Sequence, residues 1–269
     1  MTIKRVAMNE SHLDDAFALT QQLQWPHRRT DWQQMLLLGE GLVALENGTP
    51  VGTRLCWRWG RNYATLGLLR RCALPGTRYR QAAAACHARA FWRSARRFTC
   101  HGSRCMKAGF CLQWPCCAAP KPHTGSGEPY SVRSSATAGD MALLIALDRQ
   151  ALGQAQAPLT GQLLASAVRV LLLEEDGRVV GFAGLRCFGH GYSIGPVVAA
   201  QAQLLVSEQL GPVAQFVRID RPVQAGLTSW LDRLDMVQVD APITMYKAKP
   251  WQPEAGGMQT LGLQSQALA

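Results

Sequence analysis

The stretch "ENGTPVGTRLCWRWGRNYATLGLL", residues 46–69, returns 129 positions later as "EDGRVVGFAGLRCFGHGYSIGPVV", residues 175–198. Each copy consists of an apolar run, a two-residue turn and a second apolar run, which is the pattern of a β-hairpin. A long repeat of this kind indicates two copies of one structural unit. The residues that match at the constant offset are Gly48 and Gly177, Val51 and Val180, Gly52 and Gly181, Gly60 and Gly189, and Tyr63 and Tyr192.

The segments around the hairpins repeat as well. Apolar residues at helical spacing predict a helix in "LDDAFALTQQL" from residue 13 and in "MALLIALDRQAL" from residue 141. A second short helix is expected at 31–38, with Thr30 as its N-cap and Gly39 as its end. Further elements are expected as a strand at 63–69, a helix at 159–168, a strand at 192–199, a helix at 200–210, a strand at 215–220, a helix at 227–236 and strands at 237–240 and 243–248.

This order of helices and strands resembles the GNAT superfamily of N-acetyltransferases, in the tandem form that joins two such folds. The resemblance rests on four stretches, namely the hairpins "VALENGTPVGT" and "LLEEDGRVVGFAGL", the segment "LQWPHRRTDWQQMLLLGEGLVA" and the segment "LTSWLDRLDMVQVD". It covers about residues 1–70 and 132–269. It implies an α/β fold with a mixed sheet, built from two GNAT-like units at 1–130 and 131–269, of which the first is damaged.

The resemblance also implies a function, namely transfer of an acetyl group from acetyl-CoA to an amine on a small molecule or a peptide. In the family, the fourth strand offers backbone groups to the pantetheine arm, which places this role on Leu66, Gly67, Leu68 and Leu69. A glycine-rich loop then binds the pyrophosphate at a helix N-terminus. Residues 70–85 contain one glycine and no such loop. A catalytically inactive GNAT-like binding protein therefore stays open as an alternative, as does a basic nucleic-acid-binding protein.

The second unit is expected to be the weaker cofactor binder. Pro196 removes an N–H donor from its fourth strand, and the following "AAQAQLL" contains no glycine. We therefore expect this unit to complete the acceptor pocket or the shared core.

The family reaction needs a base but no nucleophilic side chain, because the substrate amine attacks the thioester directly. Glu40 and Asp31 are candidates for the base, and Tyr246 is a candidate proton donor to the leaving thiolate. Each has a plainer interpretation, since Asp31 can cap a helix, Glu40 can be solvated and Tyr246 can belong to a core or an edge strand.

The net charge of +10 comes from one segment. Fourteen of the 28 Lys and Arg residues lie between Glu46 and Glu128, where there is no acidic residue, and seven of the nine cysteines lie at 72–117 within that range. A zinc site is disfavoured because no Cys-x₂-Cys pair or His-x₃₋₅-His spacing occurs. A basic nucleic-acid arm would bind phosphate without sequence specificity. We expect no specific nucleic-acid partner and no metal.

A shifted reading frame explains this segment better. Residues 77–83, "TRYRQAA", can be encoded so that reading one base later gives Arg-Gly-Ile-Gly-Lys-Arg, which supplies the missing glycine loop. We therefore interpret about 70–130 as frame-shifted, and we expect few buried contacts at 72–128, where the arginines lack acidic partners. No apolar run reaches the roughly 20 residues that span a bilayer. We thus expect a cytoplasmic protein without membrane contact.

Sequencing the gene tests the shifted frame. We expect codons over residues 74–83 that, read one base later, encode a Gly-x-Gly loop after the strand at 63–69. An intact frame whose codons do not encode such a loop would show that the segment was always read as it is now.

Overall fold

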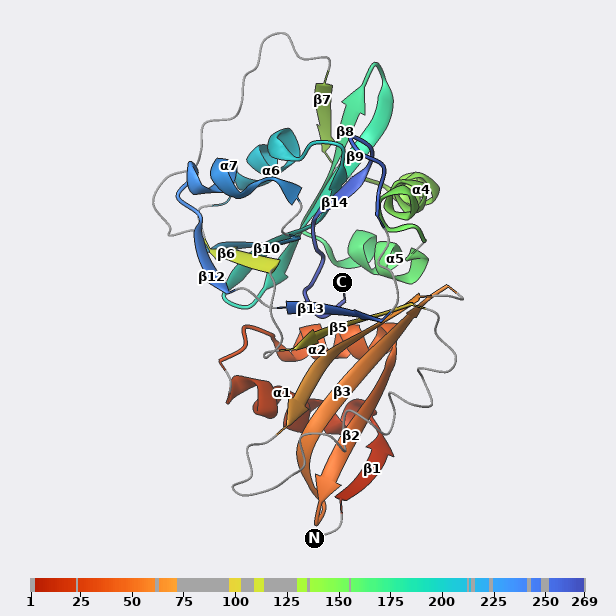
Figure 1. Ribbon diagram of the computed structural model, residues 1–269, viewed down its shortest axis with the longest axis vertical. Helices are drawn as coiled ribbons and strands as arrows, with labels where there is room; N and C mark the ends of the chain where they lie inside the picture. The colour runs from red at the N-terminus through yellow and green to blue at the C-terminus, as the bar shows by residue number, and fades with distance from the viewer. Residues whose placement is uncertain are drawn as a thin grey trace. The chain divides into compact units, whose positions relative to one another are not determined.

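Figure 1 shows the chain as a computed structural model. The structure describes residues 3–22, 24–60, 63–71, 97–102, 109–113, 130–134, 136–154, 156–211, 213, 216–222, 225–240, 243–247 and 252–268. For residues 69–71, 97–102, 109–113, 240 and 243–247 it describes the backbone alone.

The chain divides into two compact units. Unit 1 consists of Met1–Gly102, Met245–Pro250 and Leu268. Unit 2 consists of Ser103–Thr244, Trp251–Ala267 and Ala269. The fold is the expected mixed α/β architecture with one sheet in each unit.

Unit 1 is built on a six-stranded sheet with the order β1-β2-β3-β4-β5-β13. Two helices and a short 3-10 helix connect β1 to β2. The strands are β1 (Ile3–Ala7), β2 (Glu40–Glu46), β3 (Thr49–Trp59), β4 (Tyr63–Arg71), β5 (Arg97–Gly102) and β13 (Ile243–Lys247), and the helices are η1 (Glu10–His12), α1 (Leu13–Gln21) and α2 (Arg29–Leu38).

Unit 2 is built on an eight-stranded sheet with the order β12-β6-β11-β10-β9-β8-β7, in which β14 also pairs with β10. Its strands are β6 (Gly109–Gln113), β7 (Tyr130–Ser134), β8 (Arg169–Glu175), β9 (Arg178–Phe188), β10 (Gly191–Ala199), β11 (Val217–Pro222), β12 (Val237–Asp240) and β14 (Gln259–Gly262). Its helices are η2 (Ala138–Asp140), α4 (Met141–Leu152), α5 (Ala157–Ser166), α6 (Gln203–Leu210) and α7 (Thr228–Asp232).

Both expected hairpins form. Asn47 and Gly48 have φ angles of 52° and 85°, and Asp176 and Gly177 have 49° and 74°. A two-residue turn with positive φ at both positions matches the twist of the strands that it joins, and Asn-Gly and Asp-Gly tolerate this geometry best. The turns therefore fix the register of β2 against β3 and of β8 against β9.

Two edge strands were not expected from the sequence. β1 pairs antiparallel with β2, and β7 pairs antiparallel with β8. Each has five residues and at least one charged side chain, and none of its residues is fully buried. Charged residues are common on edge strands, because they discourage pairing with another chain. The same charges hide such strands from a search for apolar alternation.

The start of α2 differs from the expectation. The helix begins at Arg29, and its N-cap is Arg28 rather than Thr30. The side chain of Asp31 accepts a hydrogen bond from the backbone N–H of Arg28 at 2.8 Å. A carboxylate in the first turn supplies the acceptor that a Ser or Thr cap would otherwise provide, so the predicted Thr30 cap is wrong.

Three tryptophans, Trp32, Trp57 and Trp59, lie in the core of unit 1, and none is more than 2% exposed. The indole N–H of Trp57 donates to the backbone oxygen of Met35 at 2.8 Å, and that of Trp59 donates to the hydroxyl of Thr65 at 2.9 Å. A buried indole stabilises a core only when its N–H has an acceptor. These bonds therefore anchor α2 and β4 on β3.

Alternate residues of β8 divide the core of unit 2 into two layers. Leu171 and Leu173 pack in a cluster with buried residues of α6 and α7, whereas Val170 and Leu172 pack in a cluster with buried residues of α4 and α5. The two pairs of helices lie on opposite sides of the sheet (Figure 1). A strand that is apolar on both faces is typical of a sheet covered on both sides.

Each sheet contains one strand from the other half of the sequence. β6 lies between β11 and β12 in unit 2, and β13 lies beside β5 in unit 1. Five residues of β6 pair antiparallel with Val217–Pro222. A single boundary near residue 130 was expected, without any strand from one side of it pairing in the sheet of the other unit.

The basic segment 72–128 contributes two strands, β5 and β6, to these sheets. The rest of it, including the positions expected to carry the phosphate loop, lies outside the described residues. Few buried contacts were expected at 72–128, and the side chains of these residues also lie outside the described residues.

The two units differ at one buried polar position. In unit 1, the hydroxyl of Thr20 accepts a hydrogen bond from the indole of Trp32 at 3.2 Å. The matching residue of α4, 128 positions later, is Asp148. It is 5% exposed, and its Oδ2 has no hydrogen-bond partner in the part of the chain that the structure describes. Burial raises the pKa of Asp148 to about 7, although a hydrogen bond from the backbone of Gln156 works in the opposite direction.

We expect Asp148→Asn to stabilise the protein at pH 8 and to have little effect at pH 4. The stability that the neutral carboxyl allows is fully present below its unfolded pKa and is lost as the pH rises towards 7. Replacing the carboxyl by an amide should therefore raise the free energy of unfolding at pH 8 by roughly 4 kcal/mol. Denaturant unfolding across this pH range measures the difference.

Asp140→Asn is the matched control, because its shift has the opposite sign. A hydrogen bond from Arg133 is the main cause that lowers the pKa of Asp140 to about 2. This variant should lose stability at pH 8 and approach the native chain near pH 2. A pH-independent effect of Asp148→Asn would contradict the titration of a buried carboxyl.

Candidate functional site

The parallel strands β4 and β5 of unit 1 pair over only part of their length. The pairing runs from Tyr63 opposite Arg97 to Leu66 opposite Cys100, whereas β4 itself continues to Arg71. Beyond Leu66, no other described strand pairs with this edge of β4. Backbone N–H and C=O groups need partners, so this half of β4 is an edge that can receive an extended ligand.

A β-bulge marks the point where the pairing stops. On β3, Leu55 pairs with Gly67 and Thr53 pairs with Arg70, so two residues of β4 oppose Arg54 alone. Leu68 in the bulge has φ of 49°, which is unusual for a leucine. The hydroxyl of Thr53 donates to the backbone oxygen of Leu68 at 3.0 Å. The bulge bends β4 and separates its second half from β5.

The predicted cofactor-binding residues lie at this split. Leu66 is the last paired residue, and Gly67, Leu68 and Leu69 follow it within β4. Leu66 and Leu68 are 8% and 4% exposed as whole residues, and Gly67 between them is buried as well. Their role in cofactor binding stays a prediction.

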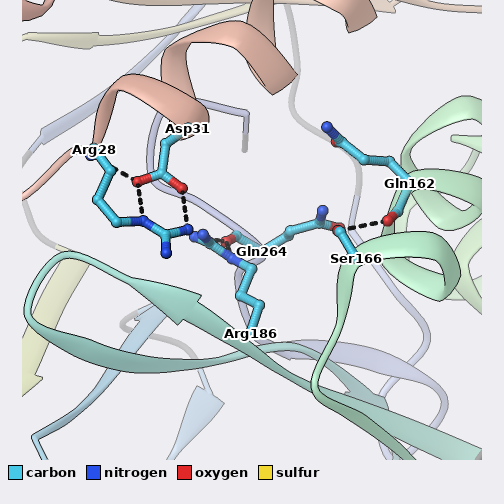
Figure 2. A network of polar contacts seen from close by, with 6 residues as sticks. All are labelled: Arg28, Asp31, Gln162, Ser166, Arg186 and Gln264. Carbon is cyan, nitrogen blue, oxygen red and sulfur yellow. Dashed lines mark hydrogen bonds and ion pairs between the residues drawn. The ribbon is translucent and has the colours of Figure 1, made fainter.

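Both carboxylate oxygens of Asp31 accept hydrogen bonds from Arg28 at the start of α2. Asp31 is 2% exposed, and its Oδ1 lies 3.0 Å from Nη2 of Arg28 while Oδ2 accepts from the backbone and Nε of the same residue (Figure 2). This geometry suits the plainer interpretation, in which Asp31 caps α2.

Glu40 lies in the same cross-strand row as Leu66, the residue after which β4 and β5 separate. It pairs with Cys56 on β3, and Cys56 pairs with Leu66 on β4. Directly paired residues project from the same face of a sheet. Two strand spacings place the backbone of Glu40 about 10 Å from that of Leu66. Glu40 is exposed, so its carboxylate can exchange protons with water.

Tyr246 lies on β13 of unit 1, and its side chain lies outside the described residues. The catalytic roles of Asp31, Glu40 and Tyr246 all stay predictions.

Cys56 in the same row is not a nucleophile. It is 3% exposed, and burial raises its pKa to about 11, against the opposing effect of Arg54 and Arg58. A thiol with this pKa is protonated at neutral pH. The row therefore suits direct transfer better than a covalent enzyme intermediate.

The side chains that the structure describes contain no group of three or more His, Cys, Asp or Glu that could hold a metal ion. No helix within the described ranges is both long and apolar enough to cross a membrane.

The matching strands of unit 2 also separate. β10 pairs with β11 only from Tyr192 to Ile194, and a bulge at Gly195 and Pro196 follows. Here β14 pairs with the second half of β10, from Val197 to Ala199. Weak cofactor binding was expected in this unit because of Pro196 and the missing glycine loop, but β14 was not expected. Its four residues, "QTLG", show no alternation long enough to predict a strand.

In each unit, the parallel fourth and fifth strands of the sheet thus separate behind a bulge. Residues 144–258 match the family model of the acetyltransferase (GNAT) domain. No curated protein sequence matches the chain.

Solved structures of similar fold cover nearly the whole chain. A protein from Pyrococcus horikoshii, named as a candidate acetyltransferase, has a TM-score of 0.72 at 15% identity and covers 99% of this chain and 96% of its own. A tandem GNAT protein from the clavulanic acid biosynthesis pathway has a TM-score of 0.63 at 13% identity, covering 93% and 100%. A GCN5-related N-acetyltransferase from Sphaerobacter thermophilus has 0.59 at 13% identity, covering 94% and 98%.

These matches confirm the resemblance to the GNAT superfamily. The chain carries a GNAT domain in its second half and has the fold of GNAT acetyltransferases, a tandem one among them. At these identities the structural likeness concerns the fold.

We expect Thr53→Val to loosen the bulge in β4. Losing the hydroxyl bond to Leu68 should cost about 1 kcal/mol of unfolding free energy. It should also speed hydrogen exchange of the amides of residues 67–69, measured by mass spectrometry of short peptides.

Thr65→Val is the control, since it removes the acceptor of the Trp59 indole on the paired half of β4. It should cost at least as much stability without speeding exchange at 67–69. Equal exchange in the two variants would mean that Thr53 does not hold the bulge.

Proposed function

We propose that the chain is an acyl-CoA-dependent N-acetyltransferase, which moves the acetyl group of acetyl-CoA to an amine at unit 1. The observation that carries this proposal is the β4 edge facing away from β3: from Gly67 onward, next to the bulge at Leu68, no described strand pairs with it. An extended pantetheine arm carries amide donors and acceptors that could complete such an edge. The GNAT fold of the chain supports the same reaction.

The pairing of β14 with β10 in unit 2 supports the proposal that the edge of β4 binds the pantetheine arm. In unit 2 the matching half of the fourth strand pairs with an extended peptide, so this part of the fold accepts an extended chain. A pantetheine arm offers the same kind of polar groups in an extended form. We infer that the open edge in unit 1 takes the arm of acetyl-CoA in the same manner.

The proposed reaction needs no covalent bond to the protein. The nitrogen of the neutral amine attacks the thioester carbonyl carbon, the C–S bond breaks, and CoA leaves as the thiolate. The proton released from the amine nitrogen goes to a base, and the thiolate takes up a proton. Binding both substrates in one orientation supplies much of the rate enhancement.

We propose Glu40 as the base. It is exposed and lies in the row that leads through Cys56 to Leu66, where the thioester would sit. The separation of about 10 Å leaves room for the amine and a bridging water. Asp31 is less suited, because both of its oxygens already accept hydrogen bonds from Arg28. Tyr246 remains the proposed proton donor to the thiolate.

The acceptor we propose is an amine on a small molecule or a peptide, in the cytoplasm. A specific nucleic-acid partner is not proposed, because the net positive charge comes from residues 47–127, which would bind phosphate without sequence specificity. A second candidate function is binding without transfer. The lack of a Gly-x-Gly loop at residues 70–85 favours it, since the pyrophosphate would lose its nest of N–H groups.

The test is calorimetric titration with acetyl-CoA, followed by measurement of CoA release with a panel of primary amines. We expect binding to the native chain, and Glu40→Gln should lower kcat roughly 100-fold with little change in the KM for acetyl-CoA.

Glu46→Gln, at the other end of β2, is the matched control and should keep both constants. A folded chain that does not bind acetyl-CoA would overturn the proposed function. Binding without transfer to any amine would favour the second candidate.

A further inference from the structure

The segment formed by residues 258–264, which contains β14, fills the place where β10 and β11 separate. It pairs antiparallel with β10, with Gly262 opposite Val197 and Gln259 opposite Ala199. Past β14, the backbone N–H of Leu263 donates to the backbone oxygen of Asp220 on β11 at 2.6 Å. The segment therefore bonds to both strands of the split.

The segment is packed as part of the core. Leu261 is 4% exposed and belongs to the apolar cluster that includes α6 and α7. A Cβ atom added to Gly262 would lie 2.8 Å from Cγ2 of Val197, and one added to Gly195 would lie 2.0 Å from the backbone oxygen of Leu263. Both glycines thus permit a close approach of backbones that any side chain would prevent.

An arginine holds the end of the segment. Nε and Nη2 of Arg186 on β9 both donate to the backbone oxygen of Gln264, at 3.1 and 2.6 Å (Figure 2). The Arg186 residue is 9% exposed, so this charge-assisted pair of bonds forms with little water around it. A backbone acceptor makes the contact independent of the side chain at position 264.

We propose that the split between β10 and β11 is a binding site for an extended peptide strand, that residues 258–264 of the chain are its resident ligand, and that this occupancy closes unit 2 to acyl-CoA. The edge of β10 gives the backbone bonds, the apolar cluster receives Leu261, and Arg186 fixes the carbonyl of Gln264. This is recognition by strand addition, in which main-chain bonds give affinity and one pocket gives specificity.

The two units then use one feature of the fold in two ways. On the side away from β3, no described strand pairs with the second half of β4 beyond Leu66, whereas β14 pairs with the second half of β10. A peptide and a pantetheine arm would compete for the same backbone groups. We therefore expect one acyl-CoA site per chain, at β4 of unit 1.

The test uses the full chain carrying both Gly262→Val and Leu263→Pro. The valine clashes with Val197, and the proline removes the N–H that bonds to Asp220, while β10, β11 and Arg186 stay intact. A fluorescent peptide with the sequence of residues 257–265 is then added. We expect it to bind this variant at least about tenfold more tightly than the native chain, whose site is filled.

Two controls separate opening from general loosening. Leu163→Ala removes a buried side chain of α5 in the other apolar cluster and should not create peptide binding. A peptide with Asp in place of Leu261 should bind the double variant at least about tenfold more weakly, since a charge cannot enter the apolar cluster. Equal peptide binding by the folded double variant and the native chain would overturn the proposal.

Two measurements on the native chain complete the test. The amides of Gln259, Leu261 and Leu263 should exchange as slowly as those of β10, and rapid exchange would overturn the resident-ligand assignment. Acetyl-CoA should bind with no more than one molecule per chain, and two would overturn the closure of unit 2. Because the peptide measurement needs no acetyl-CoA, a failure of the proposed function leaves it unaffected.

Discussion

The backbone edge where two neighbouring strands separate is the constraint on which both units depend. Parallel strands that diverge leave a row of N–H and C=O groups without partners, and such groups must be paired or solvated. β4 and β10 both diverge from their parallel neighbours behind a bulge. Unit 2 satisfies its edge with β14, whereas in unit 1 no described strand pairs with the matching edge of β4 beyond Leu66.

The two bulges reach the same result with different residues. Unit 1 holds Leu68 at a positive φ and secures its carbonyl with the hydroxyl of Thr53. Unit 2 places Gly195 and Pro196 opposite a single position of β9 and brings the backbone of Leu263 against the glycine. The fourth strand thus has a bulge at the matching place in both units, and in unit 2 β14 lies beside it.

Elements determined by local chemistry could be predicted from the sequence. The Asn-Gly and Asp-Gly turns define the hairpins, and the helical spacing in 141–152 gives α4 with both of its ends. The N-cap of α2 was wrong, because the acceptor comes from Asp31 inside the first turn rather than from Thr30 before it. β1 and β7 were missed because short, charged edge strands resemble loops.

What the sequence could not show depends on contacts between distant segments. Nothing in the order of elements distinguishes β6 as a member of the second sheet, because pairing with β11 is set by tertiary packing. The same holds for β14, whose few residues become a strand only against the open edge of β10. At the candidate site, the position of Leu66 to Leu69 on the fourth strand followed from the repeat, while the bulge at Leu68 and Leu69 did not.

Because β6 belongs to the sheet of unit 2, the basic segment contributes to the fold as well as to the net charge. Whatever reading frame produced it, Gly109–Gln113 pairs with Arg218–Pro222 on one side and with β12 on the other. Removing the segment would take away the strand that joins β12 to β11 and leave one edge of β11 without its described partner. A deletion of residues 70–128 would therefore damage unit 2 as well as unit 1, and any loss of phosphate binding in such a deletion would report on the fold as much as on the charge. Substitution of arginines outside the two strands separates these effects, because it removes charge and leaves the backbone pairing of β5 and β6 in place.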